Sequence, residues 1–460
     1  GRDACDALIA RIAAGVGRAA LIPLVVCQHA GPALVACLSD PDGAVRALSC
    51  EALARVGATV AVTPLFDLLR DRDARVSQAA AAAIQALGTI DTRRLALAEA
   101  RSNDPGTRRA ALRIVAYFGY PEAIDMLVGA IDDEDERVRE AAVVGLAMID
   151  HPRATETLLR ALREGAPRVR AACARSLGQC EAAPAVVDAL DVSLDDDDPW
   201  VRYYACQSLG KLRASDRADR VAAKLGDPAG QVRIASVEAL ARLAAAGAET
   251  RTSEALIDAA RSSDGDLRRA ALVGLGIARR PEGLSILKQA ALAADAATRL
   301  VAVSALAEFD GAEVVDALRW AASDAEESVR SAAIGYLSTR TGPAATKALL
   351  DLLLQPAVRE RTLTALAVAA DERVEGILEL LETASADVAS VYVTALTRLR
   401  RASAHAAIAA ALQFENVHAR RAAAAGLASL ATAESREALQ RAVSDADPEV
   451  RRISVAAIRR

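Results

Sequence analysis

The stretch Asp133-Glu-Asp-Glu-Arg-Val-Arg-Glu-Ala-Ala-Val-Val-Gly-Leu146 decides the fold, because the pattern inside it returns along the whole chain. The pattern is an Asp, four residues, Val138-Arg139, two residues, an Ala and, four positions later, a Leu. Asp40 to Leu53 and Asp227 to Leu240 are two further copies. A pattern that recurs at a fixed period indicates an array of repeats.

The Val of this pattern marks one position in each repeat and is called position zero here. Most steps between successive copies are 31 residues; the exceptions are 32 before Val201, 35 before Leu267, 29 before Val358 and 30 before Val388. The next residue is Arg in twelve of fourteen copies, Ser77 and Ala389 being the exceptions. Position zero falls at Val45, Val76, Thr107, Val138, Val169, Val201, Val232, Leu267, Thr298, Val329, Val358, Val388, Ala419 and Val450.

Each repeat is predicted to be a pair of helices. The first helix is short and apolar on one face, as in 123–128 and 157–162, and a turn such as Asp40-Pro41-Asp42-Gly43 follows. The second helix carries apolar residues at positions zero, four and eight, which form one face at 3.6 residues per turn. Acidic residues in the turn are suited to cap that helix and to favour its positive end.

One such helix pair cannot bury its apolar faces alone, so neighbouring pairs must stack. The chain is therefore predicted to be all-α, an alpha-alpha superhelical solenoid of about fourteen helix pairs. We expect a degenerate capping repeat at 1–30, where Pro23 interrupts a helix, regular repeats at 31–245 and less regular ones at 246–460. The chain lacks an initial Met and ends inside an expected helix, so we expect the array to continue past residue 460.

Composition agrees with a thin repeat array and restricts the function. At 460 residues the chain is too long for one compact core, and only 3% of it is aromatic. The net charge of −5 gives no support for non-specific nucleic-acid binding, which needs basic surface. No run of 18 apolar residues is present, so no membrane span is expected. Seven Cys without a CxxC pair fit reduced thiols in the cytoplasm.

The repeat closely resembles the HEAT-repeat family, in particular the short bacterial type first associated with phycobilisome lyases. The resemblance covers essentially the whole chain and implies a ladder of hydrogen bonds between the turn Asp and the helix Arg of successive repeats. The acidic position is matched by Asp40, Asp71, Asp133, Asp196, Asp227, Asp324 and Asp445. The basic position is matched by Arg46, Arg108, Arg139, Arg170, Arg202, Arg233, Arg268, Arg299, Arg330, Arg359, Arg420 and Arg451.

A search for catalytic or metal-binding motifs finds none that matches. The four His form no HExxH or His-Glu pair, which HEAT-like di-iron hydroxylases carry, and no GxGxxG, P-loop or GxSxG motif is present. Cys27, His29, Cys37 and Cys50 match no zinc or iron–sulfur spacing. The acidic run at 195–198 lacks the alternating ligands of a calcium loop and is interpreted as a turn. We therefore expect no enzyme activity, cofactor or metal.

A candidate partner-binding stripe lies on the second helices, which in this family line the concave side. Positions two, six and ten escape the core most readily, and Arg and Tyr are residues that anchor interfaces. An ordinary solvated face is the alternative interpretation. The candidate residues are Arg109, Arg113, Tyr117, Arg175, Tyr203, Gln207, Lys211 and Arg242.

These observations predict a scaffold of the bacterial cytoplasm that binds another protein or an extended peptide segment. An acidic or mixed segment would suit the mildly basic stripe. The alternative is an accessory subunit of an enzyme system, either for phycobilin attachment or for nucleic-acid processing. Neither the identity of the partner nor the oligomeric state follows from the sequence.

Overall fold

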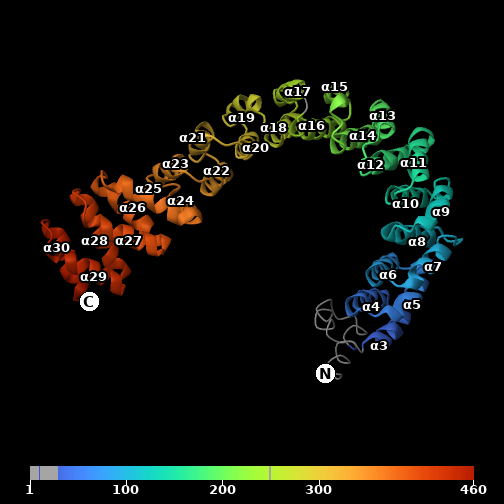
Figure 1. The fold of residues 1–460 in the computed structure, drawn as a ribbon, viewed down its shortest axis with the longest axis horizontal. Coiled ribbons are helices and arrows are strands. Elements are labelled where there is room, and N and C mark those ends of the chain that lie inside the picture. Colours follow the sequence, from blue (N-terminus) through green and yellow to red (C-terminus); the bar gives the residue numbers. More distant parts are fainter. Residues whose placement is uncertain (1–9, 11–29, 248–249, 460) are drawn as a thin grey trace. The chain divides into compact units, whose positions relative to one another are not determined.

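The fold is known from a computed structural model that describes residue 10 and residues 30–247 and 250–459. The expected capping repeat at 1–30, with Pro23, Cys27 and His29, therefore lies almost wholly outside the described residues. The chain divides into two compact units, Gly1–Ala239 and Leu240–Arg460. In both, every regular element of the described residues is a helix (Figure 1). None of these helices is long and apolar enough to cross a membrane.

The first unit is a stack of helix pairs with two layers (Figure 1). The outer layer holds the first helix of each pair: α3 (Gly31–Ala36), α5 (Val62–Asp67), α7 (Ile90–Glu99), α9 (Ile124–Ala130), α11 (Pro152–Glu164), α13 (Pro184–Ser193) and α15 (Ala218–Ala223). The inner layer holds the second helices: α4 (Gly43–Val56), α6 (Ala74–Leu87), α8 (Pro105–Phe118), α10 (Glu136–Ala147), α12 (Pro167–Leu177), α14 (Pro199–Lys211) and α16 (Gly230–Ala245), which runs past the unit boundary.

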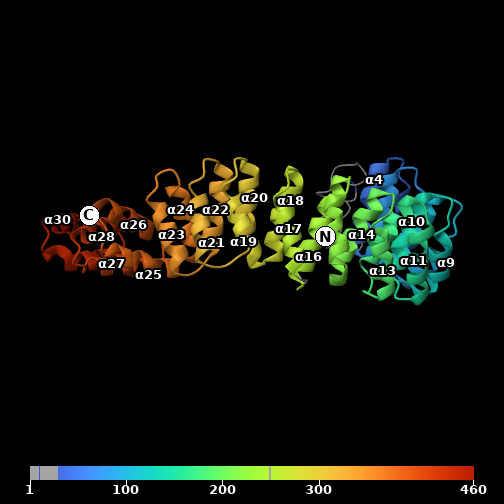
Figure 2. The same ribbon diagram turned by 90° about the horizontal axis from the view of Figure 1, so that it is seen from above.

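The second unit repeats this arrangement, and its helices lie side by side with the connecting turns along the two edges (Figure 2). Its first helices are α17 (Thr250–Ala260), α19 (Leu284–Ala290), α21 (Ala312–Ala321), α23 (Pro343–Leu353), α25 (Ala370–Leu381), α27 (Ala402–Ala411) and α29 (Ala433–Arg441). Its second helices are α18 (Gly265–Ala278), α20 (Ala296–Leu306), α22 (Glu327–Thr339), α24 (Arg359–Leu366), α26 (Ala386–Leu399), α28 (Val417–Leu430) and α30 (Pro448–Ile458).

The described residues thus contain fourteen helix pairs, and the predicted all-α solenoid is confirmed. Short 3-10 turns extend several of the first helices, for example Leu68–Arg70 after α5 and Lys224–Gly226 after α15. In most repeats a turn carboxylate begins the second helix, as Asp135 does for α10 by accepting the amides of Arg137 and Val138. This contact satisfies amides that the first turn of a helix cannot pair internally.

The core lies between the layers and follows the spacing of the repeat. In α4 the buried residues include Val45, Ser49, Ala52 and Leu53, which are positions zero, four, seven and eight. The same positions are buried in α28, where most of them are Ala or Gly. Small residues there let neighbouring helices approach closely, which explains the low aromatic content of the chain.

One buried cation in the second unit departs from this apolar core. The side chain of Arg373 on α25 is fully buried and donates to Thr346 Oγ1 and to the carbonyl of Arg340. Its Nε has no hydrogen-bond partner among the described residues. Burial lowers the pKa of this guanidinium, and the charge of Glu372 opposes that change only in part.

We expect Arg373→Met to raise the free energy of unfolding by about 1 kcal/mol, because it removes a poorly compensated buried charge at similar volume. The two lost hydrogen bonds oppose this gain by about 1 kcal/mol each, against several kcal/mol for burying the ion. The midpoint of urea denaturation, followed by circular dichroism, measures the difference. A midpoint below that of the wild type would mean that the guanidinium hydrogen bonds outweigh the charge burial.

Candidate functional site

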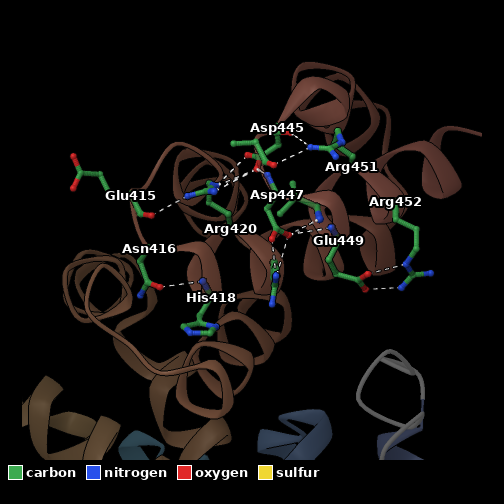
Figure 3. Close-up of polar contacts among 12 residues, drawn as sticks. Glu415, Asn416, His418, Arg420, Asp445, Asp447, Glu449, Arg451 and Arg452 are labelled. Carbon is green, nitrogen blue, oxygen red and sulfur yellow. Dashed lines mark hydrogen bonds and ion pairs between the residues drawn. The ribbon is translucent and has the colours of Figure 1, made fainter.

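The turn Asp and helix Arg of successive repeats form bidentate ion pairs in both units. Arg46 donates from Nε and Nη2 to the two carboxylate oxygens of Asp71, at 2.7 Å each. Its Nη1 donates to the carbonyls of Asp40 and Pro41 in its own turn. Six pairs of this kind occur among the described residues: Arg46–Asp71, Arg108–Asp133, Arg170–Asp196, Arg202–Asp227, Arg299–Asp324 and Arg420–Asp445 (the last in Figure 3).

These pairs also change the titration of the carboxylates. Hydrogen bonds from Arg299 lower the pKa of Asp324, although burial acts in the opposite direction. Asp71 shows the same effect from Arg46. Asp71 and Asp324 therefore stay ionised at neutral pH. Each Arg of the six pairs donates to a carbonyl of its own turn while it holds the next repeat.

Other Arg residues at the same repeat position also donate to main-chain carbonyls of their own turn, and Arg330 adds an ion pair with Glu327. Arg139 donates to the carbonyls of Asp133 and Glu134, and the matching place in the following turn holds the exposed Glu164 instead of an Asp. Arg268 donates to the carbonyl of Ser262. Turn carbonyls likewise accept from Arg233, Arg330, Arg359 and Arg451, and the side chain of Asp40 accepts from the amide of Asp42.

A second set of ion pairs links the first helices, and sequence analysis missed it. Arg70 contacts Glu99, and Arg93 contacts Glu122 at 3.0 Å. The partners lie 29 residues apart, close to one repeat length, so a search for opposite charges at that spacing could have found them. These side chains are mostly exposed, where an ion pair contributes little stability.

Three of the four carboxylates in the acidic run at 195–198 have partners within the stack. Asp195 accepts from Arg220 and Lys224, at 2.6 Å each, and Asp196 pairs with Arg170. Asp198 caps α14 by accepting the amides of Trp200 and Val201. No group of three or more His, Cys, Asp or Glu in the described part of the chain could hold a metal ion.

The predicted stripe residues lie on the second helices with varied exposure. Arg113 and Tyr117 on α8, Arg175 on α12 and Lys211 on α14 are exposed, whereas Arg109, Tyr203 and Gln207 are half-buried. Arg242 is exposed near the end of α16. Gln207 donates to the hydroxyl of Tyr203 at 2.8 Å, and Tyr117 packs against Phe118 in a separate cluster. The contacts therefore join only part of the stripe.

An aromatic cluster that sequence analysis did not assemble lies beside Arg175. The rings of Trp200, Tyr203 and Tyr204 on α14 contact one another, with centroids 5.0–6.3 Å apart. The guanidinium of Arg175 lies 5.7 Å from the centroid of the Tyr204 ring, a cation–π contact. Trp200 is 51% exposed. These residues fall at positions −1, two and three of one repeat, so all three lie in the first two turns of α14.

A hollow of about 280 Å³ opens between this cluster and α10, and we call it the aromatic pocket. Trp200 and Tyr204 form one wall, and Glu140 of α10 lies on its opposite side. Its floor is Ala171 and Ala172 of α12. Position two is Arg109 in α8, Glu140 in α10 and Tyr203 in α14. The hollow therefore forms because α12 places the small Ala171 at that position.

The charges around the aromatic pocket are only partly neutralised. Arg168 on its rim pairs with Glu136 at 2.9 Å, and Asp198 is occupied as a helix cap. Glu140 has no hydrogen-bond or ion-pair partner among the described residues, and no carboxylate there pairs with Arg175. Three further stripe cations, Arg109, Arg113 and Lys211, also have no carboxylate partner within the described chain.

The described cysteines show no sign of reactivity. Burial raises the pKa of Cys173 and of Cys206 to about 12, so both stay protonated at neutral pH. Cys50 is buried with its pKa raised in the same way, and Cys37 is half-buried. They pack as small apolar residues.

Comparison with known proteins identifies the class of the chain. A family model of HEAT repeats matches residues 31–97, 92–178, 155–241, 287–369 and 374–459. The matches cover well over half of the sequence, so the chain belongs to the HEAT-repeat family. No curated protein matches it.

Solved structures share the fold at low sequence identity. Yeast importin-beta (Kap95p) is 13% identical over 92% of this chain and 72% of that chain, with a TM-score of 0.53. Importin beta from an ammonium sulfate condition is 14% identical over the same shares, with a TM-score of 0.52. The complex of CpcE and CpcF of phycocyanin lyase from Nostoc sp. PCC7120 is 24% identical over 48% of this chain and 89% of that chain, with a TM-score of 0.33.

Proposed function

We propose that this HEAT-repeat protein is a scaffold that binds a partner protein through the second helices α8 to α14. The observation that carries the proposal is the aromatic pocket, where the exposed Trp200 and the half-buried Tyr204 lie beside an Arg175 that no carboxylate of the described chain neutralises. Trp, Tyr and Arg are the residue types that dominate binding energy at protein interfaces. The Arg170–Asp196 pair clamps the repeat of α12 to that of α14, so these three side chains are held in place at little entropic cost.

The charges favour a partner segment that carries acidic residues. Positions two, six and ten of α8, α10, α12 and α14 hold four cations, and Glu140 is the single carboxylate among them. Fields of this kind attract an oppositely charged partner and set its orientation. Such a segment would bring carboxylates to Arg109, Arg113 and Lys211, and Glu140 would accept a main-chain amide.

The size of the aromatic pocket favours one anchoring side chain over an enclosed small molecule. Its volume of about 280 Å³ is just below the usual range for small-molecule sites, about 300–1,000 Å³. An apolar or aromatic side chain of the partner would fill the space over Ala171 and Ala172. No His, Cys, Ser or Lys lines this pocket. A binding role therefore suits these side chains better than nucleophilic catalysis.

We expect Arg175→Glu combined with Trp200→Ala to weaken partner binding at least about tenfold, because both anchors are lost and one charge is reversed. Peptides selected from a random library on the full chain serve as probes, and fluorescence anisotropy measures their affinity. The selected peptides should combine acidic residues with one apolar or aromatic residue. Helicity and melting temperature should stay close to those of the wild type.

Arg319→Glu combined with Trp320→Ala is a matched control. Both residues lie on α21 in the first-helix layer, where Trp320 is 54% exposed. This variant should bind the selected peptides as the wild type does. Equal affinity of all three proteins would place the binding surface elsewhere.

A further inference from the structure

A second hollow lies on the second helices of the other unit and differs from the aromatic pocket in chemistry. It has a volume of about 810 Å³ and runs across α18, α20 and α22. Its walls include Val273 and Ile277 of α18, each 48% exposed, and Leu300 of α20. Val273 and Ile277 are one helical turn apart on the same face. We call this hollow the apolar groove.

Close packing of two backbones forms the floor of the apolar groove. A Cβ atom at Gly276 would lie 3.0 Å from the Cα of Ala305, so α18 and α20 approach each other as nearly as side chains allow. Both residues line the groove. Small residues at the floor, with Val273, Ile277 and Leu300 above them, leave a long depression with apolar sides.

The polar groups of the apolar groove are largely occupied by one another. Arg279 and Glu308 form an ion pair at its rim. The hydroxyl of Ser304 donates to the carbonyl of Leu300 at 2.9 Å. The hydroxyl of Tyr336 is the main polar atom left for an occupant. The apolar groove therefore suits a partner whose contacting surface is uncharged.

Because the apolar groove offers few free hydrogen-bonding groups, it favours a helical occupant over an extended one. An extended segment would lose hydrogen bonds to water along its main chain, and each unsatisfied group costs about 1–3 kcal/mol. A helix satisfies its main-chain groups internally. The aromatic pocket differs, since Glu140 and Arg175 could serve the main chain and side chains of an extended segment.

We propose that the apolar groove binds the apolar face of an amphipathic helix from a partner protein. Apolar side chains at positions i, i+3, i+4 and i+7 of that helix would lie between Val273 and Leu300. Its polar face would stay in water. This site is independent of the aromatic pocket and would take a partner of different chemistry.

The test uses the full chain and a synthetic amphipathic helical peptide with Leu at i, i+3, i+4 and i+7 and Lys and Glu on the other face. Fluorescence anisotropy measures its affinity, and hydrogen exchange maps the contact. We expect the peptide to protect α18, α20 and α22. The double variant Val273→Asp with Ile277→Asp should raise the dissociation constant at least about tenfold.

Ser304→Trp gives a second variant, because it fills the apolar groove without adding charge and should weaken binding in the same way. Leu292→Asp is the control, since Leu292 is 60% exposed after α19 in the same unit and outside the groove. A peptide of the same composition with its Leu residues scattered should not bind. Equal binding of the scattered peptide, or unchanged affinity in both groove variants, would overturn the proposal.

Discussion

Arg170→Ala is expected to lower the free energy of unfolding by about 3 kcal/mol, because it removes one partner of a largely buried ion pair and leaves the charge of the other. Arg170 holds both oxygens of Asp196, at 2.8 and 2.7 Å, and braces the carbonyl of Gly165. The side chains of Arg170 and Asp196 are only 18% and 14% exposed. Urea denaturation followed by circular dichroism gives the difference.

Arg139→Ala in the preceding repeat is the matched control. Arg139 reaches two turn carbonyls and no carboxylate of the described residues, so its loss should cost only about 1 kcal/mol. Similar losses for the two variants would show that the Asp contributes little beyond what the carbonyls do.

The same comparison has a defined pH dependence. Burial raises the pKa of Asp196, but hydrogen bonds from Arg170 and from the amide of Asp198 outweigh it and lower the pKa overall. A group with a lowered folded-state pKa stabilises the fold above its unfolded-state pKa of about 4, and this contribution is lost as the pH falls further. The deficit of Arg170→Ala should therefore be full at neutral pH and shrink toward about pH 3.

Gly210→Ala is expected to destabilise the first unit by about 2 kcal/mol or more, although Ala is the better helix former. Gly210 lies in the last turn of α14, where Ala would gain at most about 1 kcal/mol in helix propensity. Its Cβ would lie 2.7 Å from the Cα of Ala239 on α16, a backbone atom that cannot move alone. Overpacking of this kind costs about 1–3 kcal/mol and here exceeds the gain.

Gly335→Ala tests the opposite case. Gly335 lies within α22, and a Cβ there would meet nothing within 4 Å. We expect this change to stabilise by about 0.5–1 kcal/mol, the ordinary difference between Ala and Gly in a helix. Thermal melts of both variants decide the matter. A stable Gly210→Ala protein would mean that α14 and α16 separate at little cost.

The fold could be predicted from the sequence because the same residue pattern recurs from repeat to repeat. Buried residues at positions zero, four and eight and a carboxylate before the second helix are local signals that recur in most repeats from Val45 to Val450. The Asp partner of a helix Arg can also be predicted from the sequence, since residues such as Arg170 and Asp196 occupy fixed positions in their repeats. Arg139 could have been set apart by the same rule, because the following turn has no Asp at the matching place.

The aromatic pocket could not be predicted in this way. The pocket depends on the small side chain of Ala171 at its floor as much as on the large side chains of Trp200 and Tyr204 at its wall. A search along positions two, six and ten found Tyr203 and Arg175 but passed over Trp200 at position −1 and Tyr204 at position three. The depth of the apolar groove likewise depends on the separation of two backbones at Gly276 and Ala305, which the hydrophobic pattern does not encode.

The missing ion pairs give the stack an uneven stiffness. Among the described repeats, Arg139 leaves the joint between its own repeat and the next without a carboxylate clamp, and Arg268 does the same one repeat before α20. The aromatic pocket spans the first of these joints, and the apolar groove spans the second. The Arg–Asp pairs that do cross these joints, such as Arg153–Asp125 at the first and Arg269–Asp295 at the second, have more exposed side chains than the bidentate pairs. Both hollows therefore lie at joints that lack the bidentate Arg–Asp pair, where an arriving segment can widen its own seat at low energy.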